Sequence, residues 1–255
     1  MGDGYEIIGR RPMDAAESIG RRIVTGGLSP GTILPNLDLL AGEFAMSRLS
    51  MREAIKLLAG KGLVASTPRR GTVVRPRHEW SRLDADVLVW QLGGEPNAAF
   101  VRDLFELRRM IEPEAASLAS YRATREALAD ITKAFAMMES AAARAPESIK
   151  ADVAFHNAIL KATGNDFIAA LAPAINASLQ LVFQIQRGAW PDPENFIPTH
   201  AAVLDGIRSG DREAARRAVQ TLLISSEADA MDGLRLLNAD RHAVAATEAS
   251  GDSRR

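Results

Sequence analysis

The sequence predicts a mostly α-helical protein of two parts, an N-terminal winged helix-turn-helix and a C-terminal all-helical bundle. Residues 47–75 predict the first part, because a short helix with a basic face precedes a strand-turn-strand with the tip Pro68-Arg69-Arg70-Gly71. Residues 95–163 predict the second part, since they contain no glycine and much alanine, which favours long helices over strands. A chain of 255 residues is long enough for two domains with separate cores.

Composition and charge narrow the possible functions. The chain has no cysteine, which excludes disulfides, thiolate nucleophiles and cysteine-ligated zinc. Its net charge of -1 conceals an asymmetry, because residues 1–77 hold 12 Lys and Arg against 7 Asp and Glu. A basic module joined to an acidic body is typical of a protein that binds a polyanion through one part. We find neither a membrane-length apolar run nor a signal-peptide hydrophobic region, and therefore expect a cytoplasmic protein without membrane partners.

Two helices are expected before the basic one. The first should run from about Met13 to Thr25, where a pair of glycines ends it. The second should run from about Asn36 to Ala45, and its first residue is a typical N-cap. The apolar spacing of the second helix predicts three buried side chains: Leu39, Leu40 and Phe44.

The third helix should begin near Ser47, although Ser50 also has the spacing of a capping box. One face has the i, i+3, i+4, i+7 spacing of a core-facing stripe: Met51, Ala54, Ile55 and Leu58. Basic residues recur every four positions on another face: Arg48, Arg52 and Lys56. Many helices carry such a face merely for solvation. The basic turn that follows, and the affinity of a helix N-terminus for phosphate, favour DNA binding instead.

A connector joins the two parts. Its apolar stripe, Trp80, Leu83, Val87 and Trp90, predicts a linker helix that packs on the second domain. Further helices are expected at Asn97–Arg122, Arg125–Arg144, Ser148–Ala162, Phe167–Arg187, Glu194–Arg208 and Arg212–Leu237. Beyond Asn238 we expect a disordered tail. The predicted organisation is therefore a DNA-binding domain at 1–77, a linker helix at 78–96, a helical effector-binding domain at 97–237 and a tail at 238–255.

The first part of the chain contains several short motifs: Leu34-Pro35, Leu40-Ala41, Ser47-Arg48, Arg52-Glu53-Ala54, Gly62-Leu63-Val64 and Arg70-Gly71-Thr72-Val73-Val74. Together they resemble the winged helix-turn-helix of the gluconate-repressor (GntR) family. The resemblance implies operator contacts from four residues, with Gly71 at the wing tip: Ser47, Arg48, Ser50 and Arg52. Further candidates are Leu49, which could contact a thymine methyl, and the basic Lys56, Arg69 and Arg70. Two positions depart from the family pattern, since Leu37 replaces an acidic residue and Ala45 replaces a glycine.

Polar residues in the helical body form a second candidate site. Asp152 and His156 are i, i+4 on one predicted helix and can hold one ion, and His200 could complete the cluster. Their setting, Asp152-Val153-Ala154-Phe155-His156-Asn157 with Arg108-Arg109-Met110-Ile111-Glu112-Pro113 and Thr199-His200, resembles the FCD domain of the FadR-type subfamily. The resemblance implies that the three residues hold a divalent metal, with zinc as the first candidate. It also implies that Arg108 meets the carboxylate of an effector.

The resemblance covers nearly the whole chain. It implies a homodimeric transcriptional repressor that binds a short operator palindrome and responds to a small hydroxy-carboxylic acid such as galactonate. Many relatives have a fourth metal-binding histidine where this chain has Leu222, which leaves three protein ligands. Two alternatives stay open, a metal-free site for an acyl-type effector and a metal-dependent enzyme. We disfavour the enzyme, because no general base is evident.

Overall fold

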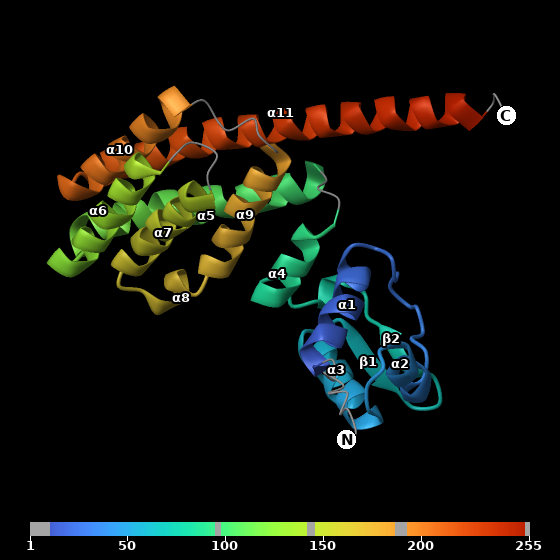
Figure 1. The fold of residues 1–255 in the computed structure, drawn as a ribbon. Helices are drawn as coiled ribbons and strands as arrows, with labels where there is room; N and C mark the ends of the chain where they lie inside the picture. The colour runs from blue at the N-terminus through green and yellow to red at the C-terminus, as the bar shows by residue number, and fades with distance from the viewer. Residues whose placement is uncertain (1–10, 95–97, 142–145, 187–192, 253–255) are drawn as a thin grey trace, which may run out of the picture. The chain divides into compact units, whose positions relative to one another are not determined.

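The computed structural model of the chain describes residues 11–94, 98–141, 146–186 and 193–252. The chain divides into two compact units, Met1–Glu95 and Pro96–Arg255 (Figure 1). Both are dominated by helices, and the described strands belong to the first unit. The predicted fold class, a winged helix-turn-helix followed by an all-helical domain, is confirmed.

The N-terminal unit consists of helices and a two-stranded antiparallel wing. The strands pair from Val64↔Val74 to Thr67↔Gly71, and Ile33 adds an isolated bridge to Val73. The elements in chain order are α1 (Pro12–Val24), α2 (Leu37–Glu43), α3 (Arg48–Gly60), β1 (Val64–Thr67), β2 (Gly71–Val74), a 3-10 turn (Arg77–Glu79) and α4 (Ala85–Leu92).

Local sequence determines where α3 begins and which face of α2 is buried. Ser47 is the N-cap of α3, because its hydroxyl accepts a hydrogen bond from the backbone N–H of Ser50 at 3.0 Å.

Leu40 and Phe44 point into the core of the unit, whereas Leu39 is 64% exposed. The expectation that Leu39 is buried is therefore wrong. Adjacent helical residues point about 100° apart, so the face that holds Leu40 and Phe44 excludes it.

The connector helix α4 belongs to the core of the N-terminal unit. Trp80, Val87 and Trp90 are buried in the same apolar cluster as the residues of α1 and α3. Gly20 of α1 makes room for Trp90, because a Cβ at this glycine would lie 2.3 Å from the indole ring. Lys61 forms ion pairs with Asp86 of α4 and with Asp84, the N-cap of this helix. The apolar stripe of the connector was expected to pack on the second domain, whereas these contacts bury it in the core of the N-terminal unit. Periodicity predicts an apolar face on the connector, but it cannot identify Gly20 as the residue that receives Trp90.

Helices of very different lengths form the C-terminal unit. The two longest, α5 and α11, run side by side, and α10 also packs along α11 (Figure 1). The elements are α5 (Ala98–Arg122), α6 (Arg125–Ser140), α7 (Pro146–Ala162), α8 (Asp166–Ala169), α9 (Ala172–Gln186), α10 (Pro193–Arg208) and α11 (Arg212–Asp252). The structure has two helices, α8 and α9, where one helix was expected at 167–187. Two expected helix ends, Arg144 and Arg187, lie outside the described residues.

Two further expectations differ from the structure. Helix α11 continues to Asp252 where a disordered tail was expected from Asn238, because residues 238–250 are rich in alanine and contain neither glycine nor proline. Among the described residues, Asp166–Ile185 is long and apolar enough for a membrane span, with 20 residues and a mean hydropathy of 1.6. Length and composition alone make this a weak indication, since a core helix passes the same test and 44% of this segment is buried.

Candidate DNA-binding surface and candidate metal centre

The residues predicted to contact DNA lie on the surface of the N-terminal unit. On α3, the core-facing stripe is buried, and the opposite face is open to solvent. The wing tip lies between β1 and β2, where Arg69 has a φ of 64° and Gly71 a φ of 87°. The exposed candidates are Ser47, Arg48, Leu49, Arg52, Lys56, Arg69, Arg70 and Gly71, and Ser50 is half-buried. Their exposure is compatible with DNA contacts, and the contacts themselves stay a prediction.

A groove of about 820 Å³ lies at the start of α3. The N-terminus of α1, the helix α2 and the first residues of α3 line it. Within it, the Nε atom of Arg48 lies 3.4 Å from Oδ1 of Asp38. Ala45 in the turn between α2 and α3 has a φ of 49°, which is the left-handed conformation that favours glycine. The departure from the family pattern at this position therefore falls where the backbone is strained.

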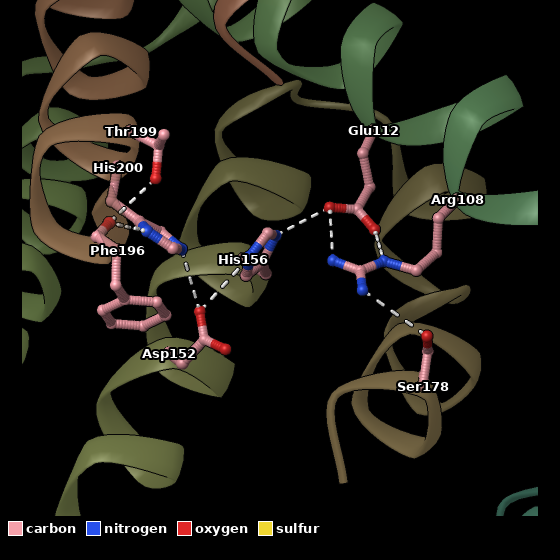
Figure 2. A network of polar contacts seen from close by, with 8 residues as sticks. All are labelled: Arg108, Glu112, Asp152, His156, Ser178, Phe196, Thr199 and His200. Atoms are coloured by element: carbon pink, nitrogen blue, oxygen red, sulfur yellow. Dashed lines mark hydrogen bonds and ion pairs between the residues drawn. The ribbon is translucent and has the colours of Figure 1, made fainter. Parts of the chain in front are cut away.

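Three potential metal ligands meet inside the C-terminal unit (Figure 2). Asp152 and His156 come from α7, and His200 comes from α10. One donor atom from each residue lies within 4.8 Å of the others. The carboxylate oxygen Oδ1 of Asp152 is 3.1 Å from Nε2 of His200 and 3.3 Å from Nε2 of His156. The structure thus brings together the three residues that were predicted from sequence as metal ligands.

The orientation of both imidazole rings suits metal binding. Nδ1 of His200 lies 2.7 Å from the carbonyl oxygen of Phe196, and Nδ1 of His156 lies 2.7 Å from Oε2 of Glu112. Because both partners accept hydrogen bonds, each Nδ1 carries the proton, and each Nε2 is directed towards Asp152. Nε2 of His156 is buried and makes no hydrogen bond to the described residues. A buried imidazole nitrogen that faces a carboxylate at 3.3 Å without a hydrogen bond, beside a second imidazole, fits a divalent cation.

Glu112 is a part of the site that the sequence did not identify. It lies on the side of His156 opposite to Asp152 and connects this histidine to Arg108 (Figure 2). The Nε atom of Arg108 donates to Oε1 of Glu112 at 2.5 Å, and its Nη1 lies 3.5 Å from the hydroxyl of Ser178. Arg108 and Glu112 lie on α5 with i, i+4 spacing, and this spacing is the feature of the sequence that could have indicated their pairing. Arg108 is only 1% exposed, so its guanidinium is buried and already paired.

Opposite charges alternate across this buried network. Burial would raise the pKa of Glu112, but Arg108 and His156 outweigh it and lower that pKa to about 2. Burial would lower the pKa of His156, but Glu112 and Asp152 raise it to about 9. Burial would likewise raise the pKa of Asp152, yet its two histidine partners hold that pKa well below its ordinary value. Without a cation, a protonated His156 therefore lies between two carboxylates.

A winged helix-turn-helix with an exposed basic face, joined to an all-helical unit, is the architecture of a DNA-binding transcriptional regulator rather than an enzyme. Residues 13–74 match the model described as "Bacterial regulatory proteins, gntR family", and residues 103–225 match the FCD domain. The chain belongs to the gntR family of bacterial regulatory proteins, with an FCD domain as its C-terminal part.

Individual relatives cover most of the chain. The galactonate operon transcriptional repressor of Escherichia coli (strain K12) is 34% identical, over 82% of this chain and 92% of the relative. The HTH-type transcriptional repressor NanR of Cronobacter sakazakii (strain ATCC BAA-894) is 30% identical, over 86% and 87% of the two chains. The solved structure of Lar, which controls the Listeria monocytogenes agr system, has a TM-score of 0.62 at 17% identity, over 90% and 99% of the chains, and supports the fold alone.

Proposed function

We propose that this transcriptional regulator is a cytoplasmic, homodimeric repressor that binds a short operator palindrome and releases it when a small hydroxy-carboxylic acid binds. Galactonate is the first candidate for the acid, because a repressor of the galactonate operon is 34% identical over 82% of this chain. The observation that carries the proposal is the buried cluster in which two imidazoles direct Nε2 towards one carboxylate.

Asp152, His156 and His200 would hold a divalent cation, with zinc as the first candidate. When bound, the cation supplies positive charge and Lewis acidity for the carboxylate and hydroxyl oxygens of the acid. Leu222 at the position of a fourth histidine leaves three protein ligands, and therefore open coordination positions. The charged side chains of the cluster, together with Glu112 and Arg108 beside it, disfavour the alternative of an apolar acyl chain in direct contact with them.

Arg108 is proposed to meet the carboxylate of the effector. Its guanidinium is buried against Glu112, and the void beside Glu112 and His156 measures about 10 Å³. Such a void holds no more than a single water, so an acid that enters it would have to displace Glu112 from Arg108 or separate the helices around it. This requirement couples binding to conformation, because the acid binds one arrangement better than the other. A tenfold loss of operator affinity needs a coupling of about 1.4 kcal/mol.

The test measures operator affinity by fluorescence anisotropy with and without galactonate. The operator is taken from duplexes that the wild-type protein selects out of a randomised library. We expect galactonate to weaken the wild-type complex at least tenfold, and His156→Ala to bind the same DNA equally well without responding. If the wild-type complex ignores millimolar concentrations of galactonate and of related hydroxy acids, the proposed effector class is wrong.

A further inference from the structure

An acidic residue lies in the surface that is proposed to face DNA. Asp38 stands in the first turn of α2, and its side chain is 66% exposed. It lines the groove at the start of α3 together with Ser47, Arg48 and Ser50. A carboxylate in this place repels phosphate and therefore weakens the binding that lysines and arginines provide for any DNA sequence.

The contact that Asp38 makes is with a proposed base-reading residue. Its Oδ1 lies 3.4 Å from Nε of Arg48, which is the first residue of α3 after its N-cap. Because the carboxylate approaches Nε, the two Nη groups stay available as the fork that matches O6 and N7 of guanine. An exposed ion pair of this kind is weak in water. It becomes stronger when the surrounding water is displaced, as happens when a helix enters a major groove.

We propose that Asp38 is a positioning residue for sequence readout, which holds Arg48 so that its Nη groups meet one guanine in each operator half-site. The proposal rests on the operator contact that is assigned to Arg48 above. Asp38 reduces affinity for every sequence through phosphate repulsion, and it restores affinity only where Arg48 finds its guanine. Repulsion of wrong partners combined with alignment for the right one is a general route to specificity. A prealigned arginine also loses less side-chain freedom on binding.

A simpler role for Asp38 makes a different prediction. A carboxylate in the first turn of a helix is stabilised by the helix dipole, and α2 would benefit from it without any DNA. That role affects the stability of the unit and leaves its base preference unchanged. Base preference, measured separately from affinity, therefore distinguishes a positioning residue from a merely structural one.

The experiment selects bound sequences from a library of randomised duplexes with full-length proteins. Asp38→Asn removes the charge at nearly constant size. Glu43→Gln is the matched control, since Glu43 is another exposed carboxylate at the end of α2 and lies 3.7 Å from Arg22. We expect Asp38→Asn to reduce the preference for guanine at one position of each half-site by about five- to tenfold, and Glu43→Gln to preserve it. Asp38→Glu, which keeps the charge, should restore most of the preference.

The same selection with Arg48 variants completes the test. Arg48→Ala should lose the preference at the same position, and adding Asp38→Asn to it should not change the base preference further. The proposal is overturned if Asp38→Asn keeps the wild-type base preference, whatever its affinity for DNA. A different failure, in which the wild-type protein enriches no sequence at all, would contradict sequence-specific DNA binding itself. Melting curves of Asp38→Asn that superimpose on those of the wild type confirm that the variant is folded.

Discussion

Replacing Glu112 by alanine should destabilise the C-terminal unit strongly. The substitution leaves the guanidinium of Arg108, which is 1% exposed, without the carboxylate that lies 2.5 Å from it. It also removes the acceptor that holds Nδ1 of His156 at 2.7 Å. Breaking one partner of a buried ion pair typically costs about 3–5 kcal/mol, because the remaining charge stays buried.

The depressed pKa of Glu112 leads to a similar magnitude. A fall from 4.5 to about 2 corresponds to roughly 3 kcal/mol of stabilisation of the ionised form in the folded protein. Since the folded-state pKa is lowered, this contribution is complete above about pH 4.5 and is lost as the pH falls towards about 2. Among the residues that the structure describes, the charged groups that face the carboxylate are Arg108 and His156.

Urea unfolding of the full-length chain in the presence of a chelator measures the effect. Far-UV circular dichroism follows mainly the helices of the C-terminal unit. With the third tryptophan of the chain replaced in all variants (Trp190→Phe), fluorescence of Trp80 and Trp90 follows the N-terminal unit as an internal reference. Glu114→Ala is the matched control on α5, because Glu114 is 57% exposed and pairs with Arg216 at the surface. Equal small shifts for both variants would refute the assignment of a buried pair.

Three further predictions concern both units. Gly20→Ala should destabilise the N-terminal unit by about 1–3 kcal/mol in tryptophan-monitored unfolding, because its Cβ would lie 2.3 Å from Trp90; an unchanged midpoint would mean that α4 docks loosely. Ala45→Gly should stabilise the same unit by about 0.5–1 kcal/mol, since φ is 49° there, and a lower melting temperature would contradict the inferred strain. Zinc must displace the proton of His156, whose pKa is about 9, so zinc affinity should rise about tenfold per pH unit from about pH 6 to pH 8; a flat profile counts against His156 as a ligand.

Much of the N-terminal unit could be predicted because its signals are local. Helix caps, the spacing of apolar residues along α3 and the turn residues of the wing all act within a few positions. The docking of α4 could not be predicted in this way. It depends on Gly20 having no side chain, and this glycine lies some seventy positions before Trp90. Only the packed structure therefore reveals the fit.

The candidate metal site combines local and distant information. The i, i+4 spacing of Asp152 and His156 can be found in the sequence, whereas the approach of His200 depends on how α10 packs in the bundle, and only family resemblance anticipated it. Glu112 was missed because its spacing from Arg108 predicts a helical ion pair and does not reveal that the same carboxylate also holds a histidine.

The central claim is that the buried cluster of the FCD domain is a metal-binding sensor site. Its most direct test is the metal content of the protein by mass spectrometry after dialysis against zinc and removal of loosely bound ions. The wild-type chain should retain one zinc ion, as should His78→Ala, which removes a histidine that is 81% exposed on the other unit. His156→Ala should retain far less. A wild-type protein without zinc, or a His156→Ala variant with as much zinc as the wild type, would contradict the claim.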